Sequence, residues 1–229
     1  MKDNKKHKKA EYGILITGLI ILLAATFVTA LCAGQYSVSV PEVTKILASR
    51  FVNVTKTWSN TAEGVVFTLR LPRIIGAVLV GSALSLSGAA YQGVFKNPLV
   101  APDLLGVSSG ACVGASVAIL LHLNSFGVQA MAFVAGILAV GLTLFIPRLI
   151  KNTNMTMLVL SGIIVKGIMD SVMGIIKYVA DPETELQSIT YWQLGSLTKV
   201  LPKDLFTVGP VIVAASVIIF LLRWRINIL

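Results

Sequence analysis

Apolar residues in this sequence form long blocks instead of alternating with polar residues. Each block is about 20 residues long, which is the length of helix that crosses the hydrocarbon core of a bilayer. Because backbone N–H and C=O groups in lipid must be satisfied within their own segment, the blocks are predicted to be helices. The pattern predicts an all-α, polytopic membrane helix bundle, a single domain over residues 1–229 with about six transmembrane helices. The six predicted spans are residues 13–34, 74–95, 104–123, 126–147, 157–179 and 205–223.

Two longer polar stretches separate these blocks. Residues 35–70 follow the first block, and their 38–51 part has apolar residues at helical spacing, so a short surface helix is expected there. Residues 181–203 precede the last block and contain a short amphipathic piece around 191–197. Trp192 in that piece is expected to act as an aromatic anchor at the membrane interface.

Small residues recur at every fourth position in two neighbouring blocks. Lipid gives little hydrophobic drive for helix association, so a ridge of small residues promotes it by allowing close backbone approach. The second and third blocks are therefore predicted to be interior helices of a compact bundle. The ridges consist of Ala77, Gly81, Ser85, Ala89 and Gly93 in the second block, and of Gly106, Gly110, Gly114 and Ala118 in the third.

Charge supports a membrane protein and sets its expected orientation. Only 13% of residues are charged, against about a quarter in soluble domains. The net charge of +9 could indicate nucleic-acid binding. However, five of the 19 basic residues lie within the first nine positions, directly before an apolar block. The positive-inside rule places such lysines in the cytoplasm, so the N-terminus is predicted to be cytoplasmic and no nucleic-acid partner is expected.

No motif for catalysis or metal binding stands out. The sequence has no phosphate-binding loop, no H-E-x-x-H and no Ser/His/Asp constellation. Cys32 and Cys112 lie inside apolar blocks without metal-binding context and are expected to be unpaired structural thiols. We expect a protein that is not an enzyme and has no metal or cofactor of its own, so any energy source must lie on another chain.

Two prolines between apolar blocks and two ionisable residues inside one block depart from the simple pattern of apolar helices. Pro98 and Pro102 force an irregular connection between the second and third blocks, with Asp103 placed to cap a helix beginning at Leu104. Lys166 and Asp170 lie one helical turn apart inside the fifth block. Ionisable groups at membrane depth are costly, so they either satisfy each other or face a cavity.

Several of these segments resemble the FecCD-type permeases, the membrane subunits of ABC importers for ferric siderophores, haem and cobalamin. The resemblance runs from about residue 12 to the last residue. It is carried by Arg70-Leu71-Pro72-Arg73, residues 81–88, Gln92, Asn97-Pro98-Leu99 and residues 105–111, and more weakly by residues 191–197 and 222–229. It implies an ABC type II importer permease-like fold, of which the full-length family has ten spans. The chain is therefore expected to be truncated before the ATPase-coupling segment and unable to support ATP-driven uptake alone.

The resemblance also implies partners and residue roles. The chain would work in the cytoplasmic (inner) cell membrane with cytosolic ABC ATPase subunits that bind the ATP, a second permease copy in a homo- or heterodimer, and an extracytoplasmic substrate-binding protein. An iron chelate (a ferric siderophore or haem) or the related metal chelate cobalamin would cross by alternating access. Arg70 and Arg73 would dock the binding protein, although arginines there could also simply reach lipid headgroups. Lys166, Asp170, Trp192 and Gly195 would border the translocation path.

Two alternatives from other classes remain open at this point. One is a truncated, non-functional permease remnant, which the missing half of the family pattern favours. The other is an ion-coupled secondary transporter, which uses ionisable residues near the middle of the membrane. Lys166 and Asp170 are the residues that favour it.

Overall fold

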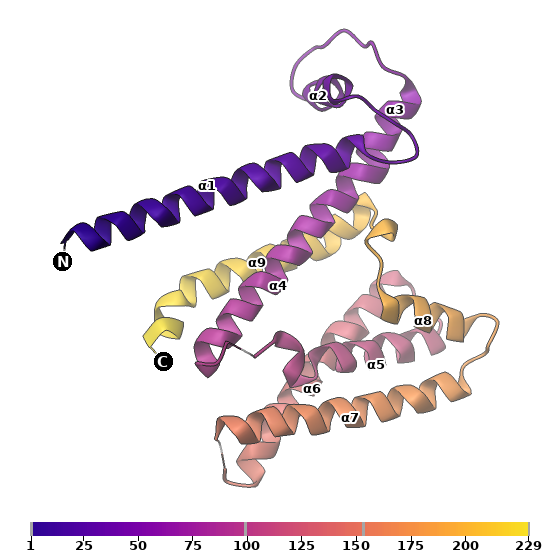
Figure 1. Ribbon diagram of the computed structural model, residues 1–229. Helices are drawn as coiled ribbons and strands as arrows, with labels where there is room; N and C mark the ends of the chain where they lie inside the picture. The colour runs from indigo at the N-terminus through magenta and orange to yellow at the C-terminus, as the bar shows by residue number, and fades with distance from the viewer. Residues whose placement is uncertain (1, 99, 153, 229) are drawn as a thin grey trace. The chain divides into compact units, whose positions relative to one another are not determined.

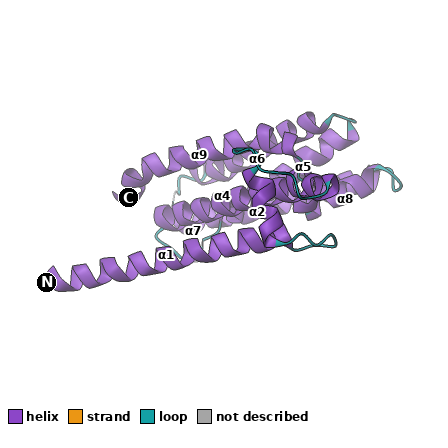
Figure 2. Ribbon diagram, turned by 90° about the horizontal axis from the view of Figure 1, so that it is seen from above, coloured by secondary structure: helices purple, strands orange, loops and turns teal. Residues whose placement is uncertain are grey.

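The structure is a computed structural model that describes residues 2–98, 100–152 and 154–228. Within these ranges every regular element is a helix (Figure 2). The long helices are α1 (Lys2–Cys32), α4 (Leu71–Phe95), α6 (Ser125–Leu149), α7 (Met155–Val179) and α9 (Pro202–Ile228). The shorter elements are α2 (Val40–Ala48), α3 (Asn60–Gly64), the π-helix η1 (Val65–Arg70), the 3₁₀ turns η2 (Pro102–Leu105) and η3 (Leu197–Lys199), α5 (Val107–Leu120) and α8 (Glu185–Leu194).

Five of the six predicted spans are helices long and apolar enough to cross a membrane. Those five are Glu11–Cys32, Asn60–Phe95, Ser125–Leu149, Met155–Val179 and Pro202–Arg225. The third predicted span differs, because residues 104–123 do not form one helix. They begin in the η2 turn and continue as α5, which has 14 residues. At 1.5 Å per residue, α5 is about 21 Å long and shorter than the roughly 30 Å hydrocarbon core.

The second span is longer than predicted because three elements join without a break. α3, η1 and α4 form one continuous helix of 36 residues from Asn60 to Phe95 (Figure 1). The Ser59 hydroxyl accepts a hydrogen bond of 3.0 Å from the Ala62 amide and so caps its N-terminus. The π-helical turn η1 lies inside this helix and ends at Arg70. Such π-helical turns within α-helices are frequently found at functional sites.

The chain divides into two compact units, which we describe separately. Unit 1 comprises residues 1–80 and 197–212, and its apolar core lies where α1 ends. The core side chains come from α1, α2, the loops on either side of α2, α3 and η1: Leu31, Val38, Val43, Ile46, Trp58, Ala62 and Val66. The predicted surface helix at 38–51 is thus α2, and its apolar face is what covers the end of α1.

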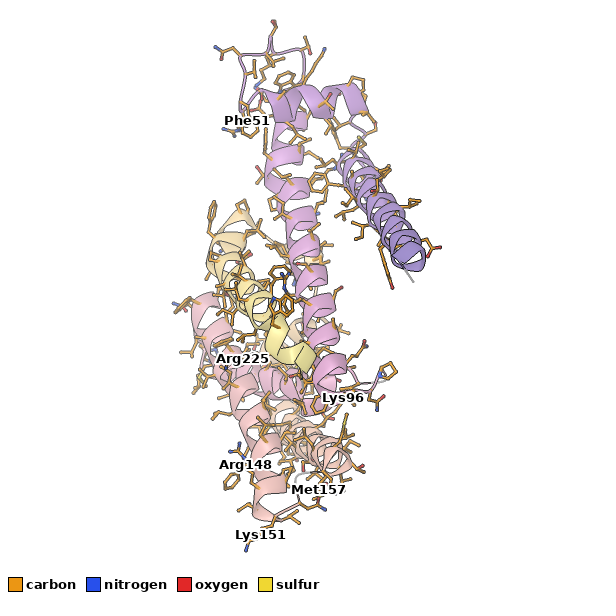
Figure 3. The ribbon with its side chains drawn as sticks, turned by 90° about the vertical axis from the view of Figure 1, so that its left-hand side faces the viewer. Phe51, Lys96, Arg148, Lys151, Met157 and Arg225 are labelled. Atoms are coloured by element: carbon orange, nitrogen blue, oxygen red, sulfur yellow. The ribbon has the colours of Figure 1, made fainter. Side chains whose placement is uncertain are left out.

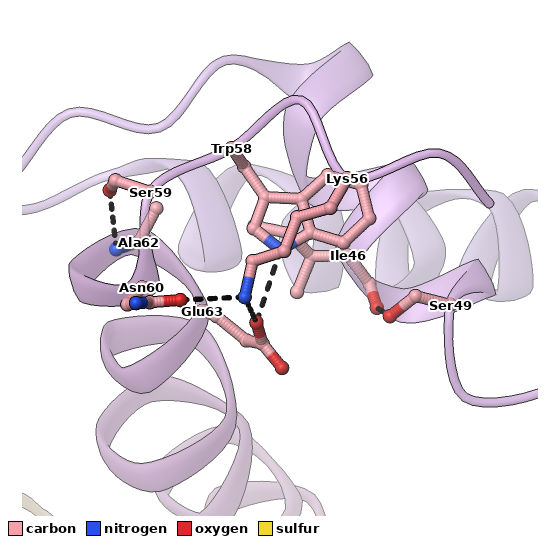
Figure 4. Close-up of polar contacts among 8 residues, drawn as sticks. All are labelled: Ile46, Ser49, Lys56, Trp58, Ser59, Asn60, Ala62 and Glu63. Carbon is pink, nitrogen blue, oxygen red and sulfur yellow. Dashed lines mark hydrogen bonds and ion pairs between the residues drawn. The ribbon is translucent and has the colours of Figure 1, made fainter.

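Polar contacts close the loop that leads from α2 into α3 (Figure 4). The Lys56 ammonium donates to the Asn60 side-chain oxygen at 2.6 Å and to the Glu63 carboxylate at 2.7 Å. The Trp58 indole N–H donates to the same carboxylate at 3.3 Å. The indole ring can therefore enter the apolar core while its N–H stays satisfied.

Unit 2 comprises residues 81–196 and 213–229, and in it α5, α6 and α7 pack against one another. A second apolar cluster joins the C-terminal ends of α5 and α7 to α8. Its buried members are Met173, Ile176, Ala180 and Ile189, and the α5 residues packed against them include Val113, Val117 and Leu120. Figure 3 shows Arg148, Lys151 and Met157 near the opposite end of α7, where α6 turns into it.

Three helices of unit 2 end in the same motif. After α4, α5 and α6 the chain turns through a non-glycine residue with positive φ: Lys96 (47°), His122 (51°) and Lys151 (55°). In each case two backbone amides bond back to helix carbonyls with the spacing of a Schellman motif, such as Asn97 N–H to Gln92 O and Lys96 N–H to Gly93 O. The predicted signature residues Gln92 and Asn97 therefore belong to the C-terminal cap of α4, with the exposed Pro98 directly after it.

Candidate functional site

Arg70 lies inside the molecule at the end of α1. Its guanidinium donates to the backbone oxygens of Leu31 at 2.6 Å and Cys32 at 3.2 Å, and also to that of Tyr36. The last carbonyls of a helix have no partner within the helix, and a cation there is favoured by the helix dipole. Arg70 thus fixes the continuous helix containing α4 to the end of α1.

This placement gives Arg70 a role inside the chain that the sequence did not suggest. The side chain is only 9% exposed, and its expected role in docking a binding protein stays a prediction. Gly34 accommodates the guanidinium: the φ of Gly34 is +146°, and a Cβ there would lie 2.5 Å from an Arg70 nitrogen. The R-L-P-R motif could not show this from sequence, because the carbonyls that hold Arg70 lie more than 30 residues earlier in the chain.

Arg73 differs from Arg70, although it lies only one helical turn further along. It is half-buried, and its Nε atom is buried without a hydrogen-bond partner among the residues that the structure describes. The docking role predicted for Arg73 therefore stays a prediction, now separate from that of Arg70.

The predicted ridge of α5 is a packing surface. A Cβ on Gly110 would lie 2.5 Å from the Ala139 Cβ, and one on Gly114 would lie 2.4 Å from the Met131 carbonyl oxygen. Only glycine allows α5 and α6 to approach this closely. Gly106 plays another part, because its φ of +72° lets the chain turn from η2 into α5.

The ridge predicted in α4 does not show such contacts within the described residues of its unit. A Cβ on Gly81 meets no atom within 4 Å, and the Ser85 side chain is exposed. Because no helix of unit 2 is packed on them there, the predicted interior position of this part of α4 stays a prediction.

The connection between α4 and α5 is fastened to α6 and α7. Thr143 of α6, fully buried, donates a hydrogen bond of 3.0 Å to the Leu105 carbonyl oxygen. The Leu104 carbonyl lies against Gly162 of α7 so closely that a Cβ there would come within 1.9 Å of its oxygen. The Asp103 carboxylate accepts a hydrogen bond of 3.0 Å from the Lys166 ammonium.

These contacts correct two expectations. Asp103 is not the cap of the third span: it lies in η2, Gly106 occupies the N-cap position of α5, and the Asp103 side chain pairs with Lys166. The ion pair that the structure shows for Lys166 is with Asp103 and not with Asp170. Sequence spacing favoured the neighbour one turn away, whereas the actual partner is 63 residues distant.

Trp192 and Gly195 lie at the end of α8. Gly195 ends the helix with a φ of +70°, and its amide donates to the carbonyls of Tyr191 and Trp192, both at 3.2 Å. Ile189, one helical turn before Trp192, is fully buried in the cluster that joins α8 to α5 and α7. α8 begins and ends earlier than the predicted piece at 191–197, because Gly195 stops it.

The described side chains include no group of three or more His, Cys, Asp or Glu that could hold a metal ion. What unit 2 does place together is Lys166 of the candidate span α7 and Asp103 of η2, with the exposed Asp170 one turn along α7. This polar group on an otherwise apolar helix is the candidate functional site of the chain.

Comparisons with known proteins identify the family. The model of the FecCD transport family matches residues 21–229. The molybdate import system permease protein of Haemophilus influenzae is 34% identical over 219 residues, which cover 95% of this chain and 64% of that protein. A probable iron chelatin transport system permease protein of Helicobacter pylori is 39% identical over 165 residues, which cover 72% of this chain and 49% of that protein.

A solved structure has the same fold. It is described as an inward-facing conformation of a metal-chelate type ABC transporter, and it matches with a TM-score of 0.79 and 30% identity over 94% of this chain and 64% of that one. The chain thus spans between about half and two thirds of the length of these proteins. On the family match, the chain belongs to the FecCD transport family.

Proposed function

We propose that this chain is a permease subunit of an ABC importer that moves an iron chelate across the cytoplasmic membrane. Ferric siderophore and haem are the candidate iron chelates, and cobalamin, a cobalt chelate, is the related alternative. The observation that carries the proposal is the family match over residues 21–229, joined to five helices long and apolar enough to span a membrane. Relatives named for haemin and vitamin B12 transport, 34% and 32% identical, support a chelate as the substrate class.

The implied mechanism is alternating access. Partner ATPases on the cytoplasmic side bind and hydrolyse ATP, and the permease switches a central path between outward and inward states. The partners of this proposal are those ATPases, a second permease copy and an extracytoplasmic binding protein, with the N-terminus of this chain in the cytoplasm. Lys166, Asp170, Trp192 and Gly195 border the path in this proposal, and Arg73 docks the binding protein.

A second candidate substrate is a tetrahedral oxyanion. The relative named for molybdate import aligns with 95% of this chain, more than the iron-chelatin relative does. An oxyanion differs from a chelate in size and charge, so the two candidates can be separated by a direct measurement.

The test is co-purification of the chain from membranes with the candidate ATPase and binding protein, followed by ATPase measurements. We expect binding protein loaded with a ferric siderophore, haem or cobalamin to stimulate hydrolysis, with unloaded binding protein as the control. Stimulation by molybdate alone would move the assignment to the oxyanion. Uptake that needs an ion gradient and no ATPase would overturn the importer and favour a secondary transporter.

Docking by Arg73 has its own test. Arg suits a carboxylate because its planar fork makes bidentate, charge-assisted bonds, so Arg73→Glu should weaken binding-protein affinity at least tenfold and Arg73→Lys less. Lys45→Glu on the exposed face of α2 is the matched control. Unchanged affinity for Arg73→Glu would remove the residue from the docking surface.

A further inference from the structure

The chain turns sharply after α2, through residues 49–52. The backbone amides of all four residues donate to carbonyl oxygens of α2, at distances between 2.9 and 3.4 Å. The amides of Phe51 and Val52 share one acceptor, the Ala48 carbonyl oxygen, each at 2.9 Å. The 49–52 turn is therefore an ordered structure, and its backbone donors do not depend on water for a partner.

Two apolar side chains of the 49–52 turn project away from the protein. Phe51, labelled in Figure 3, is 91% exposed, and Val52 is 64% exposed. The apolar face of α2 itself is used differently, because Val43 and Ile46 are buried in the core of unit 1. A single exposed apolar side chain on a surface needs no explanation. What gives Phe51 a meaning is the level at which the turn holds it.

Contacts with η1 set the level of the turn along unit 1. The Arg50 guanidinium lies 4.7 Å from the centroid of the Phe67 ring. Val66, the neighbour of Phe67 in η1, packs in the same buried core as Leu31 in the last turn of α1. The 49–52 turn is therefore level with the C-terminal end of α1.

The C-terminal end of α1 marks the surface of the hydrocarbon core. The candidate span Glu11–Cys32 has 22 residues and extends about 33 Å, which matches the roughly 30 Å of hydrocarbon in a bilayer. The last turn of α1 then lies at the boundary between acyl chains and headgroups, and the headgroup region continues for roughly 5–7 Å beyond it. The exposed Phe51 is held at this boundary.

The charge around the turn fits a lipid surface. Residues 43–62 contain three basic residues and no Asp or Glu. Two of them, Lys45 and Arg50, are exposed, whereas Lys56 is paired with Glu63. Aromatic rings and basic side chains are the groups that hold proteins at the interface of a bilayer. Two apolar side chains offer little of the roughly 800 Å² per partner that a stable protein interface buries, so lipid is the better occupant.

We propose that the 49–52 turn is an interfacial lipid anchor: Phe51 and Val52 enter the boundary between headgroups and acyl chains, and Arg50 contacts lipid phosphate. The leaflet is the one at the C-terminal end of α1, which is the outer leaflet when the N-terminus is cytoplasmic. The anchor requires only that α1 crosses the bilayer. It can therefore fail or succeed separately from the proposed transport function.

The test measures the surroundings of single cysteines labelled with bimane, in the full chain reconstituted into phosphatidylcholine and phosphatidylglycerol vesicles. Cys32→Ala and Cys112→Ala remove the native thiols. Fluorescence of the Phe51→Cys label is quenched with iodide from the water and with a lipid that carries a doxyl group near the headgroup end of its acyl chain. The two quenchers distinguish water, lipid and protein around the label.

Two positions of unit 1 calibrate the assay. Thr55→Cys is the aqueous control: it is exposed and adjoins Lys56, whose ammonium bonds to Asn60. Asn60 lies roughly 10 Å beyond Phe67 along the continuous helix, away from the lipid. Leu22→Cys, exposed in the middle of α1, is the lipid control and should resist iodide.

We expect the doxyl lipid to quench the Phe51→Cys label several-fold more than the Thr55→Cys label, and iodide to quench it several-fold less. Iodide quenching equal to that of Thr55→Cys would place the turn in water and overturn the proposal. Resistance to both quenchers would also overturn it, because a protein partner or a second copy of the chain would then cover the turn.

The contribution of Phe51 is measured with the label at Val52→Cys. Adding Phe51→Ser should lower doxyl quenching of that label and raise iodide quenching, each several-fold, because the ring no longer holds the turn in lipid. Val40→Ser is the matched control: Val40 is an exposed apolar residue at the other end of α2, and its loss should change neither value. The same quenching with and without Phe51→Ser would exclude Phe51 as the anchor.

The phosphate contact of Arg50 has a separate readout. Doxyl quenching of the Val52→Cys label should be stronger in vesicles that contain phosphatidylglycerol than in vesicles of phosphatidylcholine alone, because a cation is attracted to an anionic surface. Arg50→Glu should abolish this difference, and Arg50→Lys, which keeps the charge, should retain it. A difference that survives Arg50→Glu would overturn the phosphate contact.

Discussion

Arg70 donates a hydrogen bond of 2.6 Å to the carbonyl oxygen of Leu31, 39 residues earlier in the chain. The contact joins the first two long helices at the end of α1, where carbonyl groups would otherwise lack partners. It also explains how a positively charged side chain can be buried in an apolar core: three backbone oxygens surround its guanidinium.

Loss of this contact should destabilise the protein. Arg70→Ala leaves buried carbonyls without donors, and we expect it to lower the free energy of unfolding by about 2–4 kcal/mol. Arg70→Lys can still reach one carbonyl, so its free energy of unfolding should lie between those of the wild type and Arg70→Ala. The measurement is thermal unfolding of the detergent-solubilised chain. Wild-type stability for Arg70→Ala, together with weaker binding-protein affinity, would contradict the internal role and return Arg70 to a docking surface.

The α5–α6 contact makes a prediction about two glycines. Gly114→Ala places a methyl group against the Met131 carbonyl, so we expect a loss of about 1–3 kcal/mol from the forced separation of the helices. Gly141→Ala on α6, where a Cβ meets no atom within 4 Å, should instead gain about 0.5–1 kcal/mol from helix propensity. Similar effects of the two substitutions on unfolding would show that the close contact is not formed.

The buried hydroxyl of Thr143 is expected to stabilise the protein through its hydrogen bond to the Leu105 carbonyl. Thr143→Val keeps the shape but removes the donor, and it should cost about 1–3 kcal/mol because a buried carbonyl loses its partner. Thr17→Val is the control: the exposed Thr17 hydroxyl donates a hydrogen bond to the Gly13 carbonyl oxygen of its own helix. Its effect should be within about 0.5 kcal/mol. An equal effect of both substitutions on unfolding would argue against the η2 anchor.

The three Schellman caps predict a stabilising substitution. Lys151 has a φ of 55°, a conformation that costs an L-residue with a Cβ about 1 kcal/mol more than glycine. Lys151→Gly should therefore raise the unfolding temperature. A glycine introduced inside a helix, Ala130→Gly in α6, should instead lower the free energy of unfolding by about 1 kcal/mol. A destabilised Lys151→Gly variant would indicate that the lysine side chain contributes more than its backbone strain costs.

The long helices could be predicted from the sequence because their formation depends only on the segment itself. An apolar block of about 20 residues in lipid must satisfy its own backbone, whatever lies beside it. The ridge of α5 could be predicted for a similar reason, since the spacing of Gly110 and Gly114 places them on one face before any partner is known. The family could be named from the motifs around residues 70–111.

The site could not be predicted in the same way. The partners of Arg70 and Lys166 are 39 and 63 residues away, and sequence spacing carries no signal for contacts at such separations. Spacing favoured Asp170 as the partner of Lys166, because residues one turn apart are the only neighbours it reveals. Pro98 and Pro102 did indicate a break, but not that the turn following it would lie beside the middle of another helix.

The continuous helix from Asn60 to Phe95 has a consequence for what stands above the lipid. Its 36 residues extend about 54 Å, so more than 20 Å of an upright helix would remain outside the roughly 30 Å that a bilayer can bury. The N-terminal part of this helix does not stand alone, because Arg70 and the apolar core around Leu31 join it to the end of α1. The α2–α3 region is therefore supported by two helices at once.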